Sequence, residues 1–267
     1  MADHSSLLQR LFSLHGKTAL ITGAGGGIGR VLALALAEAG ARVAVHDVKA
    51  DLLAQSSRAI ADTGGEVVSF LADLGEVAHC RQLIRDMHVS LGRLDVLVNC
   101  AGMNRRAPIT AVTEDDYEAI TAVNLRSIFF LSQAAHPIMR AQGGGKIINI
   151  GSLSAFMALE TVSVYGMTKG AVTQLTRTMA IEWAKDNIQV NCIAPGFMLT
   201  PLTETSLWGD ERKRRWLLDR IPMRRPGQPD ELVGITLLLA SGASSYLTGQ
   251  TIVVDGGVLA GGSWEPD

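Results

Sequence analysis

Cysteine and histidine are scarce in this sequence, and the few that are present do not cluster. The three cysteines, Cys80, Cys100 and Cys192, form no CxxC pair, a pattern typical of reduced thiols in a reducing compartment. The six histidines include no HExxH motif, and none has a cysteine at ligand spacing. These absences argue against a disulfide framework and a zinc site, so we expect no metal.

Long apolar runs and an excess of one charge are also missing. The longest apolar stretch, "VLALALAEAGARVAV", is broken by Glu38 and Arg42 and falls short of a membrane span. The N-terminus carries Asp3, has no early basic cluster, and is interrupted at Arg10, unlike a signal peptide. A net charge of −2 gives no overall field that would attract nucleic acid or an acidic membrane. We therefore expect a cytoplasmic protein with neither of these partners.

What the chain does contain is a regular alternation of short apolar runs with helical patterns. The runs are nearly continuous, as in parallel strands covered on both faces, and lie at 17–22, 41–47, 66–73, 94–102, 145–152, 187–196 and 250–257. Helical patterns follow a glycine loop as far as residue 38 and recur at 49–63, 75–91, 113–141, 162–185 and 229–241. The sequence predicts the α/β class, with a single Rossmann-like, doubly wound domain over 1–267. Its seven-stranded parallel sheet would have helices on both faces.

Residues 197–228 interrupt the alternation. We predict that this insertion covers the edge of an active site. Its basic run is broken by acidic residues, which favours a solvated helix over a nucleic-acid patch. Met198, Trp208, Trp216 and Met223 could face a substrate, but we expect most of them to be core residues.

A glycine-rich loop, "TGAGGGIGR", directly follows the first strand and opens a helix. Gly23, Gly27 and Gly29 give the spacing GxxxGxG. Without side chains the backbone can approach a pyrophosphate, and the helix N-terminus offers unpaired N–H groups. A flexible turn is the alternative, but the position after a first strand favours a dinucleotide site.

Asp47 ends the second strand, at roughly 20 residues from the loop, where an acidic residue holds the adenosine ribose in such folds. A solvated turn carboxylate or a helix cap is the alternative. The carboxylate would repel the 2′-phosphate of NADP, and the loop 24–28 has no Lys or Arg to attract it. The sequence therefore favours NAD over NADP.

The stretch "GSLSAFMALETVSVYGMTKG" places Ser152, Tyr165 and Lys169 among small and apolar neighbours. Tyr165 and Lys169 are four residues apart and share a helix face. This pattern fits a reaction site and also fits an ordinary polar helix face with Tyr–Lys packing. The stretch alone does not decide between them.

Further motifs stand in a fixed order along the chain: "TGAGGGIG" (22–29), "NCAG" (99–102), Asn124 in "AVNL", Ser152, "YGMTK" (165–169) and "PG" (195–196). With these motifs the chain resembles the short-chain dehydrogenase/reductase family from about residue 14 to about residue 257. The resemblance implies a nicotinamide-dependent oxidoreductase. Its catalytic tetrad would be Asn124, Ser152, Tyr165 and Lys169.

The resemblance also implies how NAD would be held. Asp73 would touch the adenine, Asn99 would steady the central strand, and Thr200 would hold the nicotinamide amide. The full expected set is Gly23, Gly27, Ile28, Gly29, Asp47, Asp73, Leu74, Asn99, Ala101, Gly102, Tyr165, Lys169, Pro195, Gly196 and Thr200. One departure is Cys100, where the family's motif usually has a second asparagine.

The chemistry of alcohol oxidation explains the tetrad, because the alcohol must lose a hydride and a proton. A tyrosine ionises at about pH 10 in water, so its anion needs nearby positive charge. Lys169 would supply that charge, and Ser152 would hydrogen-bond the substrate oxygen. By resemblance, Asn124 would hold a water that connects Lys169 to solvent.

Two arginines, Arg105 and Arg106, follow "NCAGM" at the end of the fourth strand. They could form a clamp for a substrate carboxylate, since guanidinium matches carboxylate geometry, or be ordinary surface residues. Ser154 is a third candidate for substrate contact. In overall look the chain is closest to gluconate-type and related sugar-acid dehydrogenases.

Three functions remain open. The first is an NAD-dependent dehydrogenase of a sugar acid or polyol. The second is a 3-oxoacyl-thioester reductase, which usually prefers NADPH, so Asp47 counts against it. The third is a dinucleotide-binding regulatory protein without catalysis, which the intact tetrad disfavours. By resemblance, we expect a homotetramer joined through the helices at 113–141 and 162–185.

Overall fold

The computed structural model describes residues 4–262, which contain a seven-stranded sheet. All neighbouring strands run parallel, in the order β3-β2-β1-β4-β5-β6-β7. The strands are β1 (Thr18–Thr22), β2 (Arg42–Asp47), β3 (Val67–Leu71), β4 (Val96–Asn99), β5 (Gly145–Ile150), β6 (Ile188–Pro195) and β7 (Thr251–Val254). The predicted fold class is confirmed.

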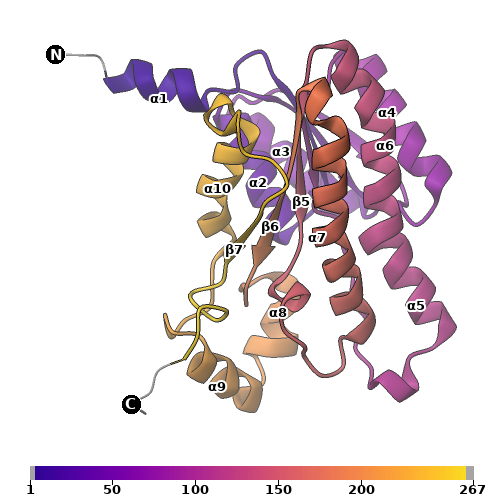
Figure 1. The fold of residues 1–267 in the computed structure, drawn as a ribbon, viewed down its shortest axis with the longest axis vertical. Coiled ribbons are helices and arrows are strands. Elements are labelled where there is room, and N and C mark those ends of the chain that lie inside the picture. Colours follow the sequence, from indigo (N-terminus) through magenta and orange to yellow (C-terminus); the bar gives the residue numbers. More distant parts are fainter. Residues whose placement is uncertain (1–3, 263–267) are drawn as a thin grey trace.

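Helices cover both faces of the sheet (Figure 1). Residues of α2, α3 and α10 pack on one face, and residues of α4, α6 and α7 pack on the other. The helices are α1 (His4–Phe12), α2 (Gly27–Glu38), α3 (Ala50–Asp62), α4 (Val77–Leu91), α5 (Glu114–Thr121), α6 (Ser127–Ala141), α7 (Ser163–Trp183), α8 (Pro201–Thr203), α9 (Glu211–Arg220) and α10 (Val233–Ala240).

Strand β1 shows why the sheet forms in the middle of the molecule. Every residue of "TALIT" is buried. Ala19 and Ile21 enter the core on one face, whereas Leu20 enters the core on the other. Side chains alternate between the faces of a strand, so a run that is apolar throughout is stable only where both faces are covered.

The strand order reverses beside β1. The chain passes from β1 to β2 and β3 on one side, then returns to β4 on the other side of β1. The connections therefore leave the carboxyl ends of β1 and β4 in opposite directions. Such a switch point opens a crevice at the carboxyl edge of a parallel sheet, where ligands bind.

The long helix expected at 113–141 is divided in two. A π-helical turn, Ala122–Arg126, joins α5 to α6 and contains Asn124, which is fully buried. Such turns insert an extra residue into a helix and occur frequently at functional sites. Apolar periodicity does not reveal this turn, because the pattern continues through it.

The segment 197–228 lies near the carboxyl ends of the strands and contains α8 and α9 (Figure 1). It forms a small core with the stretch after β5, made of Leu153, Phe197, Trp208, Leu217 and Ile221. Met198 and Trp208 are buried, but Trp216 is 38% and Met223 58% exposed. The expectation that most of these four residues are core is therefore wrong: Trp216 lies on the surface of α9, where the Arg220 guanidinium stacks on its ring, and Met223 lies beyond the end of that helix.

No helix within residues 4–262 is long and apolar enough to cross a membrane. The same part of the chain has no group of three or more His, Cys, Asp or Glu side chains arranged to hold a metal ion. The three cysteines are free thiols. Burial raises the pKa of both Cys80 and Cys192 to about 11, so these two thiols stay neutral.

Lys146, on β5, gives a pH-dependent contribution to stability. Its Nζ donates to the carbonyl and hydroxyl oxygens of Ser244, both at 3.2 Å, and burial lowers its pKa from 10.5 to about 8. The protonated amine therefore costs free energy in the folded state. This cost is full below pH 8, and it is relieved as the pH rises from 8 to 10.5, because the folded protein loses the proton first.

We predict that the free energy of unfolding of the wild type, relative to Lys146→Met, rises by up to about 3 kcal/mol between neutral pH and roughly pH 10. Urea unfolding of both proteins at the two pH values measures this difference. The methionine variant corrects for every other group that titrates in the range. An unchanged difference would contradict the lowered pKa of Lys146.

Candidate active site

The glycine-rich loop after β1 requires glycine for space. Gly23 has φ +69°, and a Cβ there would lie 2.7 Å from Ala101 Cα. A Cβ on Gly29 would overlap the carbonyl oxygen of Gly23. Helix α2 begins at Gly27 with no side-chain cap, so its first N–H groups are available to an anion.

Asp47 is tied to this loop from the end of β2. Its Oδ2 accepts from the backbone N–H of Gly25 at 2.9 Å, and its Oδ1 accepts from that of Lys49 at 3.0 Å. A Cβ on Gly25 would lie 2.6 Å from the same Oδ2. The carboxylate is thus held in place with further lone pairs free to accept hydroxyl protons.

The other residues expected near the adenosine lie around the same strand ends. Asp73 follows β3, is exposed, and accepts the N–H of Gly75 on its Oδ1 at 2.8 Å. Leu74 is buried in the core, and Ile28 is half-buried in the first turn of α2. Their contacts with a dinucleotide stay predictions.

The end of β4 is fixed by a buried polar chain. Asn99 is 1% exposed, and its Nδ2 donates to Ser132 Oγ at 3.2 Å and to Asn149 Oδ1 at 2.9 Å. Asn149 in turn donates to Thr176 Oγ1 at 2.9 Å. These bonds join β4 and β5 to α6 and α7, as expected of a residue that steadies the central strand.

Cys100 comes next, where a second asparagine is usual in the resemblance stated above. Its backbone N–H donates to Thr22 Oγ1 at 3.1 Å, and the N–H of Ala101 donates to the same oxygen at 3.2 Å. Burial raises the pKa of the Cys100 thiol to about 12, so it stays neutral. The backbone bonds that shape the turn therefore do not involve this side chain.

Three of the four predicted catalytic residues lie in α7 or just after β5. Lys169 is 4% exposed, and its Nζ donates to the carbonyl oxygen of Ile150 at 2.7 Å. The same Nζ lies 5.5 Å from the centre of the half-buried Tyr165 ring. Ser152 is 8% exposed and lies two residues beyond the end of β5. A buried ammonium, a phenol and a hydroxyl thus share the carboxyl edge of the sheet.

Asn124 reaches this place from the π-helical turn. A Cβ built on Gly102 would lie 3.5 Å from Asn124 Oδ1 and 3.9 Å from Lys169 Nζ, so both side chains border the loop after β4. The amide of Asn124 accepts the N–H and donates to the carbonyl oxygen of Met103, both at 2.8 Å. Its side chain therefore holds this loop in place, and the water relay expected of it stays a prediction.

Comparison with known proteins identifies this arrangement. A family model described as "Enoyl-(Acyl carrier protein) reductase" matches residues 23–259. The chain is 42% identical over 250 residues to the 2-dehydro-3-deoxy-D-gluconate 5-dehydrogenase of Escherichia coli (strain K12), covering 93% of this chain and 98% of that protein. It is 37% identical over 262 residues to a tropinone reductase homologue of Arabidopsis thaliana, covering 97% and 85% respectively.

A solved structure agrees with these matches. The gluconate 5-dehydrogenase from Burkholderia cenocepacia J2315, in complex with NADP and tartrate, is similar with a TM-score of 0.91 at 43% identity. The similarity covers 96% of this chain and 99% of that chain. The chain belongs to the short-chain dehydrogenase/reductase family.

As a short-chain dehydrogenase/reductase, the chain is an oxidoreductase that acts on CH–OH groups with a nicotinamide dinucleotide. Its own residues fit that cofactor. The space beside Gly26 is open, the N-terminus of α2 is uncapped, and the Asp47 carboxylate is fixed beside the loop.

The expected nicotinamide end of this short-chain dehydrogenase/reductase lies after β6. Pro195 is the last residue of β6, and a Cβ on Gly196 would lie 2.6 Å from Asp255 Cα. Thr200 caps α8, and its backbone N–H donates to the hydroxyl oxygen of Thr203 at 2.9 Å. Gly27 approaches Thr200, since its Cβ would lie 3.7 Å from that of Thr200. The loop after β6 therefore borders the glycine-rich loop.

The two arginines differ in their surroundings. Arg105 Nη1 donates to Asp116 Oδ1 at 3.0 Å on α5, and this bond lowers the pKa of Asp116. Arg106 is exposed. Ser154 lies closer to the tetrad, because its N–H donates to Ser152 Oγ at 3.1 Å. Arg105 is thus paired with Asp116. Arg106 and Ser154 stay predicted substrate contacts.

Sequence reasoning missed Thr161, which connects two loops at the site. Its φ is +65°, a left-handed conformation that is costly for a β-branched residue. Its carbonyl oxygen accepts the N–H of Ala107 at 3.0 Å, which joins the loop after β4 to the loop before α7. Nothing in the sequence signals this conformation, because threonine is rare where φ is positive.

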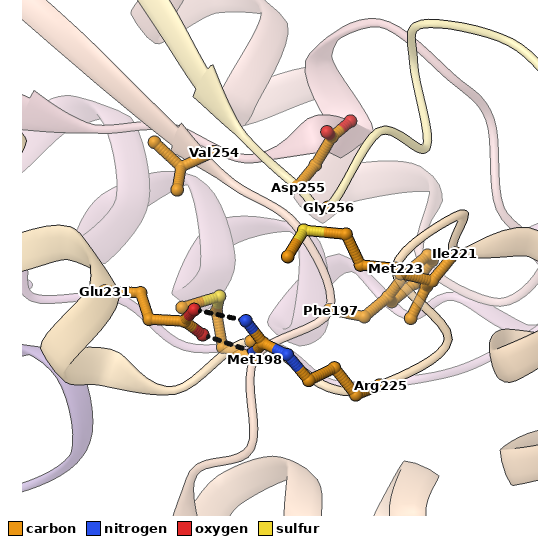
Figure 2. Close-up of a pocket in the computed structure, with 10 residues that line it drawn as sticks. Phe197, Met198, Ile221, Met223, Arg225, Glu231, Val254, Asp255 and Gly256 are labelled. Atoms are coloured by element: carbon orange, nitrogen blue, oxygen red, sulfur yellow. Dashed lines mark hydrogen bonds and ion pairs between the residues drawn. The ribbon is translucent and has the colours of Figure 1, made fainter.

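A cavity of about 80 Å³ lies between the segment 197–228 and the residues that end and follow β7, and Figure 2 shows its lining. Arg225 and Glu231 form a two-bond ion pair at its side, at 2.6 and 2.8 Å, and Met198 and Met223 supply apolar surface. The cavity is lined largely by the segment 197–228 and by none of the predicted catalytic residues.

Proposed function

We propose that this short-chain dehydrogenase/reductase interconverts a secondary hydroxyl group and a ketone of a small polar substrate, a sugar acid such as gluconate, with NAD. The observation that carries the proposal is the contact of Lys169 with the end of β5, two residues before Ser152, and with the Tyr165 ring, at the sheet edge where Asp47 is tied to the glycine-rich loop. The substrate class is supported by two relatives that are named for gluconate-type compounds.

The proton chemistry belongs to the chain's own side chains. Tyr165 takes the hydroxyl proton during oxidation and returns it during reduction. The amine of Lys169 lies 5.5 Å from the ring centre, where its positive charge would stabilise negative charge that develops on the phenol oxygen as the proton moves. Ser152, which already accepts a backbone N–H on its Oγ, keeps its own hydroxyl proton for the substrate oxygen.

A bound nicotinamide dinucleotide would accept or supply the hydride. Asp47 would hold the adenosine ribose, and the N-terminus of α2 would face the pyrophosphate. Thr200 would hold the nicotinamide amide, as the resemblance implies. Burial of Lys169 and half-burial of Tyr165 would keep bulk water away from the reacting groups.

The choice of NAD over NADP rests on Asp47. The solved gluconate 5-dehydrogenase holds NADP, so that structure does not support a preference for NAD. The proposed preference of this chain therefore depends on its own residue at the adenosine ribose. We predict that Asp47→Asn lowers the ratio of kcat/KM for NAD to kcat/KM for NADP by about tenfold or more. The ribose hydroxyls of NAD lose a charged acceptor, and the 2′-phosphate of NADP is no longer repelled by a carboxylate. The amide oxygen can still accept the N–H of Gly25, which keeps the loop in place.

Steady-state kinetics with both cofactors measures this ratio for the wild type and for Asp47→Asn. The wild type should favour NAD. A wild type that favours NADP, or a ratio that the substitution leaves unchanged, would remove Asp47 from the ribose site.

Selection of an anionic substrate is assigned to Arg106, because Arg105 is paired with Asp116. We predict that Arg106→Gln raises the KM for a sugar acid about tenfold while leaving a neutral polyol almost unaffected. Arg105→Gln is the matched control and should change neither. Equal losses on acid and polyol would show that Arg106 orders the loop and does not bind the substrate.

A reductase of 3-oxoacyl thioesters is the second candidate, and it is favoured by the similarity to a solved 3-oxoacyl (acyl-carrier-protein) reductase from Agrobacterium tumefaciens C58, at 35% identity and a TM-score of 0.90. A panel of sugar acids, polyols and acyl thioesters, each assayed with NAD(H) and NADP(H) by nicotinamide absorbance, separates the two. We expect the highest kcat/KM for a sugar acid with NAD. A preference for an acyl thioester would replace the proposed substrate, and turnover of any compound removes a purely regulatory role.

We also propose that the protein assembles as a homotetramer through α5, α6 and α7. An apolar hollow of about 340 Å³ lies on these helices, lined by Thr121, Ala122, Leu125, Arg126, Phe129, Phe130 and Leu175. Phe129 is 43% exposed there, and contact with a second copy would cover it. Sedimentation velocity tests this, and a monomer at micromolar concentration would contradict it.

A further inference from the structure

Two side chains outside the tetrad donate hydrogen bonds to the backbone of the glycine-rich loop. Arg30, in the first turn of α2, folds back so that its Nη2 donates to the carbonyl oxygen of Gly25. Its Nε donates to Ser56 Oγ at 2.8 Å. Ser56, on α3, is fully buried and donates to the carbonyl oxygen of Ala24 at 2.6 Å. The two side chains therefore bond to each other and to two consecutive loop carbonyls.

The N–H groups of the same two loop residues are held from β2. Ala24 N–H donates to the carbonyl oxygen of His46 at 2.8 Å, and Gly25 N–H donates to Asp47 Oδ2 at 2.9 Å. All four backbone polar groups of Ala24 and Gly25 thus have partners. A glycine-rich loop is otherwise conformationally permissive, and these bonds restrict it without help from a ligand.

We propose that Arg30 and Ser56 are positioning residues for the nicotinamide dinucleotide. They hold the loop in its binding conformation and, through Gly25, keep the Asp47 carboxylate beside it. A loop that is ordered in advance loses less conformational entropy on binding, so affinity for the dinucleotide is higher. The proposal concerns the dinucleotide alone and is independent of which substrate the enzyme takes.

A purely structural role is the rival explanation. Arg30 Nη2 also lies 3.3 Å from the carbonyl oxygen of Leu52 and 3.3 Å from Gln55 Oε1, so this side chain joins α2 to α3 as well. If only this packing matters, the loss of Arg30 lowers thermal stability but leaves the affinity of the folded protein unchanged. If Arg30 positions the loop, affinity falls while kcat at saturating dinucleotide stays the same.

The test measures binding separately from turnover. NADH or NADPH, whichever binds the wild type more tightly, is titrated by fluorescence into the full-length protein, and Tm and kcat are measured in parallel. Arg30→Met should raise the Kd about tenfold or more, because a bond from a charged donor is lost. Arg30→Lys should recover part of the affinity, since an ammonium can reach one acceptor but lacks the guanidinium fork.

Ser56→Ala tests the other half of the pair. It should raise the Kd in the same direction, because the carbonyl of Ala24 loses its partner. In the double variant with Arg30→Met the two effects should be less than additive, since the two side chains bond to each other. Fully additive effects on the Kd would mean that they do not act as one unit.

Arg42→Met is the matched control. Arg42 lies at the opposite end of β2, where its Nε donates to Glu66 at 2.7 Å and its Nη1 to the carbonyl oxygen of Leu91 at 3.3 Å. Its loss removes similar bonds far from Asp47 and should leave the Kd unchanged.

The proposal is overturned if Arg30→Met binds the dinucleotide as the wild type does, or if kcat at saturation falls in parallel with affinity. If Arg30→Met fails to fold, Arg30→Lys decides. A Kd raised severalfold with unchanged kcat then supports the proposal, and a wild-type Kd overturns it.

Discussion

Tyr165→Phe should abolish turnover while the affinity for the dinucleotide stays close to that of the wild type. The substitution keeps the half-buried ring in α7 and removes only the hydroxyl group that is proposed to exchange a proton with the substrate. General acid–base catalysis contributes roughly 10²–10⁴-fold, so kcat should fall on the order of a thousandfold. Nicotinamide absorbance at saturating concentrations gives kcat, and fluorescence titration gives the Kd.

Tyr117→Phe is the matched control for this substitution. Tyr117 is 44% exposed on α5, and the loss of its hydroxyl should leave both kcat and Kd unchanged. If Tyr165→Phe kept most of the wild-type activity, the assignment of the base would be wrong.

Lys169→Met should lower kcat by a comparable factor and also weaken dinucleotide binding. Lys169 is nearly buried and anchored to the carbonyl oxygen of Ile150, so its charge is held beside the ring of Tyr165. Methionine keeps the aliphatic length but removes that charge, which we expect to lower kcat on the order of 10²–10³-fold. The dinucleotide Kd should rise, because the family resemblance assigns this lysine to the nicotinamide ribose.

Lys185→Met, at an exposed position beyond the end of α7, controls for the loss of a lysine and should behave as the wild type. A double variant with Tyr165→Phe should turn over about as slowly as Tyr165→Phe alone, since the two side chains act as one unit. A much slower double variant would mean that Lys169 has a separate catalytic role. A Kd that Lys169→Met leaves unchanged would remove the lysine from the ribose.

The sheet was predictable from the sequence because its strands are buried on both faces. A run such as "TALIT" in β1 is nearly continuous in apolar residues, a pattern that is visible in five consecutive residues, and all five are buried in the structure. The assignment of Ser152, Tyr165 and Lys169 to one reaction site came from the family resemblance, because their stretch of sequence alone also fits an ordinary polar helix face.

Other features depend on partners that are distant in sequence. Arg30 stands at the end of the glycine motif, but its bond to Ser56 joins two helices and has no local signature. Asp116 likewise withdraws Arg105 from the expected clamp. The π-helical turn at Asn124 and the positive φ of Thr161 are backbone conformations that tertiary contacts impose against local preference. Periodicity in the sequence predicts helices and strands, but it does not predict contacts between residues that are distant in the sequence.

The most direct test of the proposed reaction follows the reacting hydrogen. The wild-type enzyme is incubated with NAD⁺ and the best sugar acid of the panel, deuterated at its carbinol carbons, and the reduced dinucleotide is examined by mass spectrometry. We expect NADH that carries a deuterium, formed by the wild type and not by Tyr165→Phe. Failure to form NADH from any sugar acid, or NADH without the label, would contradict hydride transfer from a sugar acid to NAD.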